Sequence, residues 1–187
     1  MQASLSSIIA ADPEFSGSIG TDKHTVHSYI AHFYELVLPF YRDRSISFLE
    51  IGINNGASLA LWASYFSDSR IVGVDISDNV NPHWRGHQNI EYFFFDAYEV
   101  DKIKSQPDFD LIIDDGCHTL RGQMVAIQSY SQKLLPGGML VIEDIQDPEM
   151  LTYLESAVPD GFSATRLDLR SIKRRYDDLL LIVRRDG

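Results

Sequence analysis

Apolar and polar positions alternate along the chain in patterns that predict helices and strands in turn. Apolar side chains recur at helical spacing over residues 26–40, and Pro39 indicates that this helix ends close to it. A β-rich run at residues 46–51 follows. It leads through a glycine turn into residues 59–66, whose apolar side chains share one helical face. The first third of the chain therefore predicts a helix, a strand, a loop and a second helix.

Four more short apolar runs predict strands, and a carboxylate follows each of them directly. These runs are residues 71–74, 92–95, 109–113 and 139–142. A helical face over residues 124–134 precedes the last run, and Pro136, Gly137 and Gly138 form the turn between them. Because strands alternate with helices, we expect a parallel sheet that is covered on both faces and binds ligands outside the carboxyl ends of its strands. The carboxylates should therefore face a cleft.

The C-terminal part of the chain predicts a different arrangement. A helix is expected at residues 148–157, followed by β-rich runs at residues 162–169 and 179–183 with no useful helical pattern between them. These runs predict a closing hairpin. A basic cluster lies between them and indicates a solvated hairpin tip; it comprises Arg170, Lys173, Arg174 and Arg175. No repeat or linker interrupts the pattern, so residues 1–187 are expected to form a single domain.

Composition and charge narrow the range of partners. The chain has 187 residues with 44% hydrophobic composition, enough for one substantial core, and a formal net charge of −11. An acidic surface does not neutralise phosphates, so no nucleic acid and no membrane surface is expected as a partner. We see no leader-like or membrane-spanning pattern, and the single cysteine, Cys117, agrees with a reducing compartment. A cytoplasmic protein is expected.

The segment EIGINNGAS, from Glu50 to Ser58, predicts a cofactor-binding loop. Gly52 and Gly56 permit the tight turn and the close backbone approach that a cofactor needs. A dinucleotide-binding loop usually has a further glycine where Asn54 stands, because pyrophosphate lies against bare backbone there. Glu50 would repel pyrophosphate but could accept hydrogen bonds from the ammonium group of a ligand. The loop therefore favours S-adenosylmethionine, a sulfonium amino acid, over NAD.

Two acids at later strand ends complete the predicted cofactor site. Asp75 lies roughly 20 residues beyond the glycine loop, where an acidic group accepts hydrogen bonds from ribose hydroxyls. Asp96 could accept from an adenine amino group. Each aspartate alone would be read as a turn residue, since aspartate is common in turns. Their order along the chain favours a binding role.

The ends of the fourth and fifth predicted strands form an acidic rim. The runs IIDDGCH and VIEDIQ place Asp115, His118, Glu143 and Asp144 there. Converging carboxylates repel one another unless a cation neutralises them, and oxygen donors without a cysteine cluster fit Mg²⁺ better than zinc. His118 could remove a proton from an acceptor hydroxyl, although an isolated histidine at a helix start more often bonds to backbone. Asp114 could face either the cofactor or the metal.

These residues resemble the class I S-adenosylmethionine-dependent methyltransferases over nearly the whole chain. The segment GTDKHTVHSY, from Gly20 to Tyr29, with Tyr34 downstream, is similar to the N-terminal signature of the macrolide-sugar O-methyltransferases of the mycinamicin and macrocin type. The resemblance implies a Rossmann-like seven-stranded sheet, with residues 1–45 forming a helical segment that covers the cofactor. The full cofactor site expected from pattern and resemblance is Thr21, Lys23, His27, Tyr29, Glu50, Gly52, Asn54, Asn55, Gly56, Ser58, Asp75, Ile76, Asp96, Ala97 and Asp114. The structural alternative is that Thr21 or Asp22 caps a helix and that Lys23 is solvated.

The resemblance also implies roles at the rim: Asp115, Glu143 and Asp144 as metal ligands and His118 as the base. The chain departs from the family pattern at Cys117 and at residues 146–148, which leaves the acceptor open.

The function that these features favour is a metal-dependent O-methyltransferase acting on a hydroxyl of a glycosylated natural product, a sugar or a glycan. A second subunit is expected to supply part of the acceptor pocket, which makes the protein a homo-oligomer. The alternatives are an NAD-dependent oxidoreductase and a non-catalytic S-adenosylmethionine-binding module. Two weaker features, the loop at residues 79–88 and the basic cluster, are expected to pack on or lie at the surface.

Overall fold

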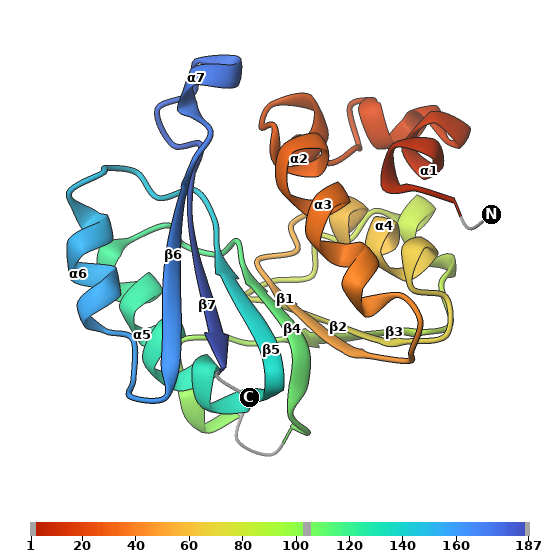
Figure 1. Ribbon diagram of the computed structural model, residues 1–187. Helices are drawn as coiled ribbons and strands as arrows, with labels where there is room; N and C mark the ends of the chain where they lie inside the picture. Colours follow the sequence, from red (N-terminus) through yellow and green to blue (C-terminus); the bar gives the residue numbers. More distant parts are fainter. Residues whose placement is uncertain (1–2, 103–105, 186–187) are drawn as a thin grey trace.

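A computed structural model describes residues 3–102 and 106–185 of the chain. Within these residues, seven strands form one sheet in the order β3-β2-β1-β4-β5-β7-β6 (Figure 1). The strands are β1 (Ser47–Ile51), β2 (Arg70–Asp75), β3 (Ile90–Phe94), β4 (Phe109–Asp114), β5 (Leu134–Ile142), β6 (Phe162–Asp168) and β7 (Leu179–Arg185). Neighbours from β3 to β5 pair in parallel, whereas β7 runs antiparallel to β5 and β6. The structure confirms the predicted mostly parallel sheet and its closing hairpin.

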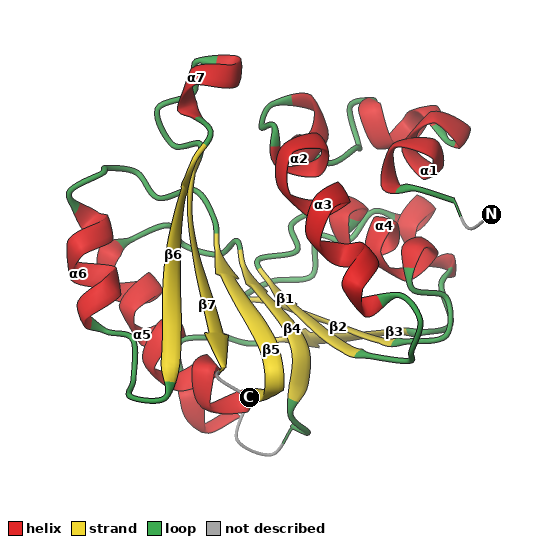
Figure 2. Ribbon diagram, in the orientation of Figure 1, coloured by secondary structure: helices red, strands yellow, loops and turns green. Residues whose placement is uncertain are grey.

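Helices cover both faces of this sheet (Figure 2). They are α1 (Leu5–Ala11), α2 (Asp22–Thr25), α3 (Glu35–Val37), α4 (Ala57–Tyr65), α5 (Leu120–Tyr130), α6 (Met150–Ser156) and α7 (Arg170–Lys173). Short 3-10 turns occupy Pro13–Ser16, Leu38–Tyr41, Pro82–Gly86, Val100–Lys102 and Ser131–Lys133. Helices α5 and α6 lie on one face and α1 to α4 on the other, and a cluster of buried apolar side chains lies on each side. None of the described helices is long and apolar enough to cross a membrane.

The predicted helix at residues 26–40 is divided into three short pieces. A π-helical turn at Ile30–Tyr34 leads into α3, and a 3-10 turn at Leu38–Tyr41 ends the segment. The wide π turn changes the helical register, so that Ile30, Phe33 and Tyr34 are all buried. Pro39 lies in the 3-10 turn that ends the segment. Because proline has no backbone N–H, it cannot continue a helix, and the helical segment ends close to it as predicted.

Strand β5 begins five residues before the predicted run. Its pairing with β4 passes from Phe109 opposite Leu134 to Leu111 opposite Met139, so residues 135–138 form a bulge. Gly137 in this bulge has φ of +75°, a conformation that favours glycine. The turn residues at 136–138 therefore bend the strand instead of preceding it.

The hairpin tip carries α7, which stands away from the sheet near α2 (Figure 1). Lys173 is exposed, as the solvated basic cluster predicted here requires, but it also makes specific contacts. Its Nζ donates to the carbonyl oxygens of His24 and His27 at 2.7 Å and of Thr25 at 3.2 Å. A lysine beside the last carbonyls of a short helix satisfies acceptors that the helix leaves unpaired. Lys173 thus ties the C-terminal hairpin to the N-terminal segment.

Candidate functional site

The glycine loop joins β1 to α4 and lies against the end of β4. Gly52 and Gly56 have φ of +80° and +87°, and Asn54 has φ of +43°. A Cβ atom built on Gly52 would lie 2.0 Å from the carbonyl oxygen of Asp115. Only glycine fits where two backbones approach so closely. The loop therefore brings the end of β1 directly beside the start of the acidic rim.

Asp75, at the end of β2, holds the glycine loop in place. The backbone amides of Ile53 and Asn54 donate to Oδ2 of Asp75 at 3.0 and 2.9 Å, and the Ser77 amide donates to Oδ1 at 3.3 Å. Asp96 accepts in the same way from the Tyr98 amide at 2.9 Å. Both acids thus act as turn residues, the alternative weighed from the sequence. Both also line a cavity, where their remaining lone pairs are available to a ligand.

This cavity has a volume of about 920 Å³ and lies outside the carboxyl ends of β1, β2 and β4. Its size suits a cofactor with room for part of an acceptor. The sequence-predicted residues that line it are Thr21, Gly52, Asn54, Asn55, Ser58, Asp75, Ile76, Asp96, Ala97, Asp115 and His118. The glycine loop and two residues of the rim therefore face one space.

Other predicted cofactor residues do not line this cavity. Lys23, His27, Tyr29, Glu50, Gly56 and Asp114 are absent from its wall. Glu50 is buried behind the loop, where its Oε2 accepts from the Ser58 hydroxyl at 2.9 Å, and burial raises the pKa of Glu50 to about 7. Asp114 is buried as well, with a pKa raised by burial to about 6.

Tyr98, which no sequence motif marks as functional, also lines the cavity. Its hydroxyl donates to Oδ1 of Asp114 at 2.8 Å and accepts from the Cys117 amide at 3.1 Å. A tyrosine just after a strand gives no sequence signal for such a role, because aromatic residues there more often pack against the sheet.

Lys23 enters the rim from the N-terminal segment. Its Nζ lies 2.6 Å from Oδ2 of Asp115 and 3.5 Å from Oε1 of Glu50, and it forms an ion pair with Oε2 of Glu143. Its side chain is only 2% exposed, so the solvated Lys23 of the structural alternative was wrong. Burial opposes the charge, but the nearby carboxylates outweigh it and hold the pKa of Lys23 well above its usual range. The ammonium is therefore charged inside the protein.

Local structure explains how Lys23 reaches this position. Oγ1 of Thr21 accepts from the Lys23 amide at 3.3 Å and begins α2 as its N-terminal cap. The capping expected as the structural alternative for Thr21 is thus present, and Thr21 also lines the cavity. Helix α2 then directs the side chain of Lys23 into the rim.

Two tyrosines and a histidine of the N-terminal segment reach the same rim. The Tyr29 hydroxyl donates to Oδ1 of Asp144 at 2.6 Å, and the Tyr34 hydroxyl donates to Oε1 of Glu143. Nδ1 of His27 lies 3.6 Å from Oδ1 of Asp144 and 2.6 Å from Oδ1 of Asp178, the residue directly before β7. These side chains bind protein carboxylates, whereas the resemblance implied cofactor contacts for His27 and Tyr29.

His118 lies where the rim meets the cavity. Its Nε2 is 3.2 Å from Oδ1 of Asp115 and 3.8 Å from Oδ2 of Asp144. Burial lowers the pKa of His118, but the hydrogen bond to Asp115 and the two carboxylate charges raise it further, to about 9. His118 and Asp144 both have left-handed backbones, with φ of +50° and +52°, a strain that often accompanies functional sites. Asp115, His118 and Asp144 each offer one possible ligand atom, and these three atoms lie within 4.8 Å of one another.

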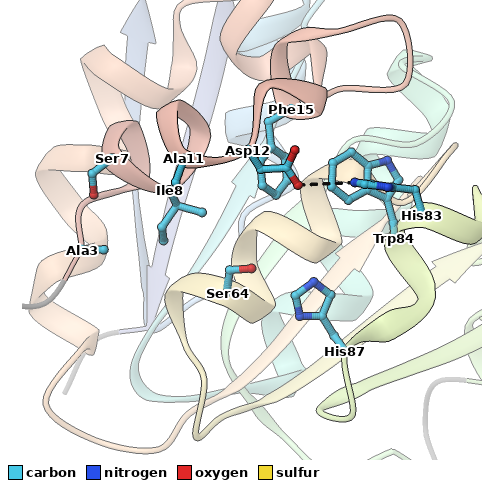
Figure 3. A pocket seen from close by; sticks show the side chains of 10 residues that line it. All are labelled: Ala3, Ser7, Ile8, Ala11, Asp12, Phe15, Ser64, His83, Trp84 and His87. Atoms are coloured by element: carbon cyan, nitrogen blue, oxygen red, sulfur yellow. Dashed lines mark hydrogen bonds and ion pairs between the residues drawn. The ribbon is translucent and has the colours of Figure 1, made fainter.

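A second cavity, of about 460 Å³, lies among α1, α4 and the loop at residues 79–88 (Figure 3). Trp84 stacks on Phe15 with ring centroids 4.6 Å apart, and its Nε1 donates to the Ile19 carbonyl at 2.8 Å. His83 lies 3.3 Å from Asp12. This loop therefore packs the N-terminal segment onto the sheet, as expected, and shares no lining residue with the larger cavity.

Comparison with known proteins identifies the family. The family described as a methyltransferase domain matches residues 49–145, just over half of the chain. The chain belongs to this methyltransferase family. The match runs from β1 to the residues after β5, so it includes both the glycine loop and the rim. Membership leaves the NAD-dependent oxidoreductase without support.

Curated relatives of this chain are named as O-methyltransferases. The 8-demethyl-8-alpha-L-rhamnosyl tetracenomycin-C 2'-O-methyltransferase of Streptomyces olivaceus is 29% identical over 86% of the chain and 43% of its own length. The mycinamicin VI 2''-O-methyltransferase of Micromonospora griseorubida is 30% identical over 77% of the chain and 38% of its own length. The chain thus spans less than half the length of these relatives.

Solved structures of a methyltransferase also resemble this chain. The MycE methyltransferase from the mycinamycin biosynthetic pathway, in complex with Mg and SAH, matches with a TM-score of 0.74 and 24% identity in one crystal form, covering 100% of this chain and 56% of MycE. A second crystal form gives a TM-score of 0.64 and 27% identity over 77% of this chain and 37% of MycE. The class I methyltransferase fold and the resemblance to the mycinamicin type are therefore confirmed.

Proposed function

We propose that this chain is a metal-dependent O-methyltransferase that transfers the methyl group of S-adenosylmethionine to a hydroxyl of a sugar-containing acceptor. One observation carries the proposal: Asp115 and His118 line the same cavity as the glycine loop. A methyl donor held by that loop and an acceptor hydroxyl beside His118 would share one space. Direct transfer requires this arrangement, because the donor carbon and the attacking oxygen must meet in line.

The wall of the cavity suits S-adenosylmethionine. Asp75 and Asp96 offer carboxylate oxygens for ribose hydroxyls and an adenine amino group, and Ile76 offers an exposed apolar surface beside them. Residues of the glycine loop, among them Gly52 and Asn54, line the same cavity. MycE, which shares the fold, is described in complex with SAH, the product of this cofactor.

The rim fits a divalent cation such as Mg²⁺. The three side chains within 4.8 Å of one another are Asp115, His118 and Asp144, and the two carboxylates supply the hard oxygen donors that Mg²⁺ prefers. When bound, such an ion acts as a Lewis acid that lowers the pKa of an acceptor hydroxyl. Glu143, the third ligand that the resemblance implied, already binds Lys23 and Tyr34.

His118 is proposed as the general base. Its Nε2 lies close to two carboxylates, and their charges keep a proton on the imidazole. If a bound cation neutralised Asp115 and Asp144, this cause would be removed, and Nε2 of His118 could then accept a proton from an acceptor hydroxyl. While Nε2 carries its proton, the hydrogen bond to Oδ1 of Asp115 orients the ring.

We expect the protein to bind S-adenosylhomocysteine in a calorimetric titration with Mg²⁺ present and not to bind NAD. With a panel of glycosylated natural products as acceptors, release of S-adenosylhomocysteine should require Mg²⁺ and should stop when EDTA removes it. Restoration by added Mg²⁺ is the control for damage by EDTA. Turnover that continues in EDTA would exclude the metal from the proposal, and NAD binding would exclude the cofactor.

A further inference from the structure

One backbone carbonyl of the N-terminal segment accepts hydrogen bonds from two side chains that come from different parts of the chain. Nδ2 of Asn55, in the glycine loop, donates to the Ile19 oxygen at 3.0 Å, and Nε1 of Trp84 donates to the same oxygen at 2.8 Å. Nδ2 of Asn55 also donates to the Gly20 oxygen at 3.5 Å. Residues 19 and 20 lie in a turn and a bend, outside any helix or strand. These bonds therefore attach an irregular segment to the rest of the fold.

The attached segment forms part of the wall of the larger cavity. Residues 20–22 line this cavity, and so does Asn55. Trp84 lines the smaller cavity instead; its side chain is buried and stacks on Phe15 (Figure 3). The wall is therefore held by one donor that borders the cofactor cavity and by one that does not.

The side-chain amide of Asn55 is occupied by the protein at both ends. Its nitrogen donates to the Ile19 and Gly20 oxygens, and its Oδ1 accepts from the Ala57 amide at 3.0 Å, at the start of α4. Carbonyl oxygens only accept and a backbone N–H only donates, so this pattern fixes which end of the side chain is the nitrogen. A cofactor could use the donor end of Asn55 only by displacing the wall.

We propose that Asn55 is a positioning residue that holds residues 19–22 against the glycine loop and thereby slows release of the cofactor, with Trp84 as the second donor to the same carbonyl. The inference rests on the S-adenosylmethionine site of the proposed function. Lys23 anchors the far end of this segment at the acidic rim, and the bonds to Ile19 anchor the end beside the glycine loop. Neutral hydrogen bonds are a modest restraint, so the wall opens locally, and its opening sets the rate at which the cofactor leaves.

Release of S-adenosylhomocysteine from the full chain, measured by surface plasmon resonance with Mg²⁺ present, tests this role without any acceptor. Asn55→Ser keeps an oxygen that can accept from the Ala57 amide but loses the amide donor to Ile19. We expect its dissociation rate to rise by roughly 3- to 10-fold, the effect of about one net hydrogen bond. The association rate should change little, because a closed wall retains the ligand and does not attract it. A variant that was only less stable would bind at lower capacity with an unchanged dissociation rate.

Trp84→Phe removes the second donor from outside the cofactor cavity. Its dissociation rate should rise by roughly 2- to 5-fold, although the substituted side chain does not border the cavity. His83→Ala is the matched control: His83 neighbours Trp84 in the same 3-10 turn but pairs with Asp12, and the dissociation rate should stay at that of the wild type.

Hydrogen exchange followed by mass spectrometry locates the change within the chain. In Asn55→Ser and in Trp84→Phe, the amides of residues 18–22 should exchange faster than in the wild type, whereas those of α4 should not. Circular dichroism shows whether each variant is folded, and Trp84→Phe carries the test if Asn55→Ser folds poorly.

The possible outcomes separate this inference from the proposed function. Wild-type release by a folded Trp84→Phe protein would overturn the inference and leave the cofactor site intact. Faster release by Asn55→Ser without faster exchange at residues 18–22 would also overturn it, because Asn55 would then act by touching the cofactor directly. Failure of the wild-type protein to bind S-adenosylhomocysteine would instead overturn the proposed cofactor site, and this inference with it.

Discussion

Replacement of His118 by alanine is expected to lower methyl transfer by about 10²- to 10⁴-fold, the usual contribution of a general base. His118 is the titratable nitrogen base that lies at both the rim and the cavity among the described residues. Without it, the acceptor hydroxyl must lose its proton to water. Turnover is measured as release of S-adenosylhomocysteine with Mg²⁺ and a glycosylated acceptor.

The same variant should bind S-adenosylhomocysteine like the wild type, because Asp75 and the glycine loop are unchanged. His32→Ala is the matched control: this histidine is exposed on the N-terminal segment, away from the cavity, and its loss should leave turnover unchanged. Full turnover by His118→Ala would remove the histidine from the proposed mechanism. Loss of cofactor binding by the variant would point to a structural role instead.

The sheet was predictable because each strand has its own local signal. The apolar run of β4 is fully buried over Phe109–Asp114, as expected for a central parallel strand covered on both faces. The carboxylate at the end of such a run then lies at one edge of the sheet whatever the loops do. The sequence therefore predicts that the strand-end acids Asp75, Asp96, Asp114 and Glu143 face one cleft. Asp75 and Asp96 do line the cavity, whereas Asp114 and Glu143 are buried away from its wall.

The partners within the rim were not predictable in this way. Lys23 and Glu143 lie 120 residues apart, and neither position shows the other in its local pattern. The family resemblance named Lys23 as a cofactor contact and Glu143 as a metal ligand. Whether a buried lysine neutralises a carboxylate depends on how the N-terminal segment packs, which is decided by tertiary contacts such as that of Tyr34. Residue type alone indicates charge, not pairing.

The irregular elements were missed for a related reason. The helical spacing over residues 26–40 is compatible with an α-helix. In the structure, however, a π turn at Ile30–Tyr34 buries Ile30 and Tyr34 in the core. Likewise Pro136 and Gly137 predict a turn before a strand, whereas they form a bulge within β5. Residues such as proline and glycine indicate where the backbone departs from regular structure. Whether that departure is a turn or a bulge depends on the pairing with the neighbouring strand.

Replacement of Gly52 by alanine is expected to destabilise the fold by about 2–5 kcal/mol, the sum of left-handed strain and overpacking. Its φ is +80°, and the new Cβ would lie 2.0 Å from the carbonyl oxygen and 2.5 Å from the carbonyl carbon of Asp115. These are backbone atoms, so no side chain can turn aside. The Asp115 amide also donates to the Ile51 carbonyl at 2.9 Å, and relief of the clash would disturb the pairing of β1 with β4. The melting temperature should fall by roughly 2–4 °C for each kcal/mol.

Two other glycines allow strain and collision to be separated. At Gly86 an added Cβ meets no atom within 4 Å, and the backbone is not left-handed, so Gly86→Ala should change stability by no more than about 0.5 kcal/mol. At Gly137 the space is also open but φ is +75°, so Gly137→Ala should show the strain alone, about 1–2 kcal/mol. Gly52→Ala should exceed both. It should also weaken S-adenosylhomocysteine binding beyond what its lower stability explains, because the displaced atoms are those that join the glycine loop to Asp115. Equal melting temperatures for the Gly52 and Gly137 variants would show that β4 yields to the clash, and the close approach would then not be what requires glycine at position 52.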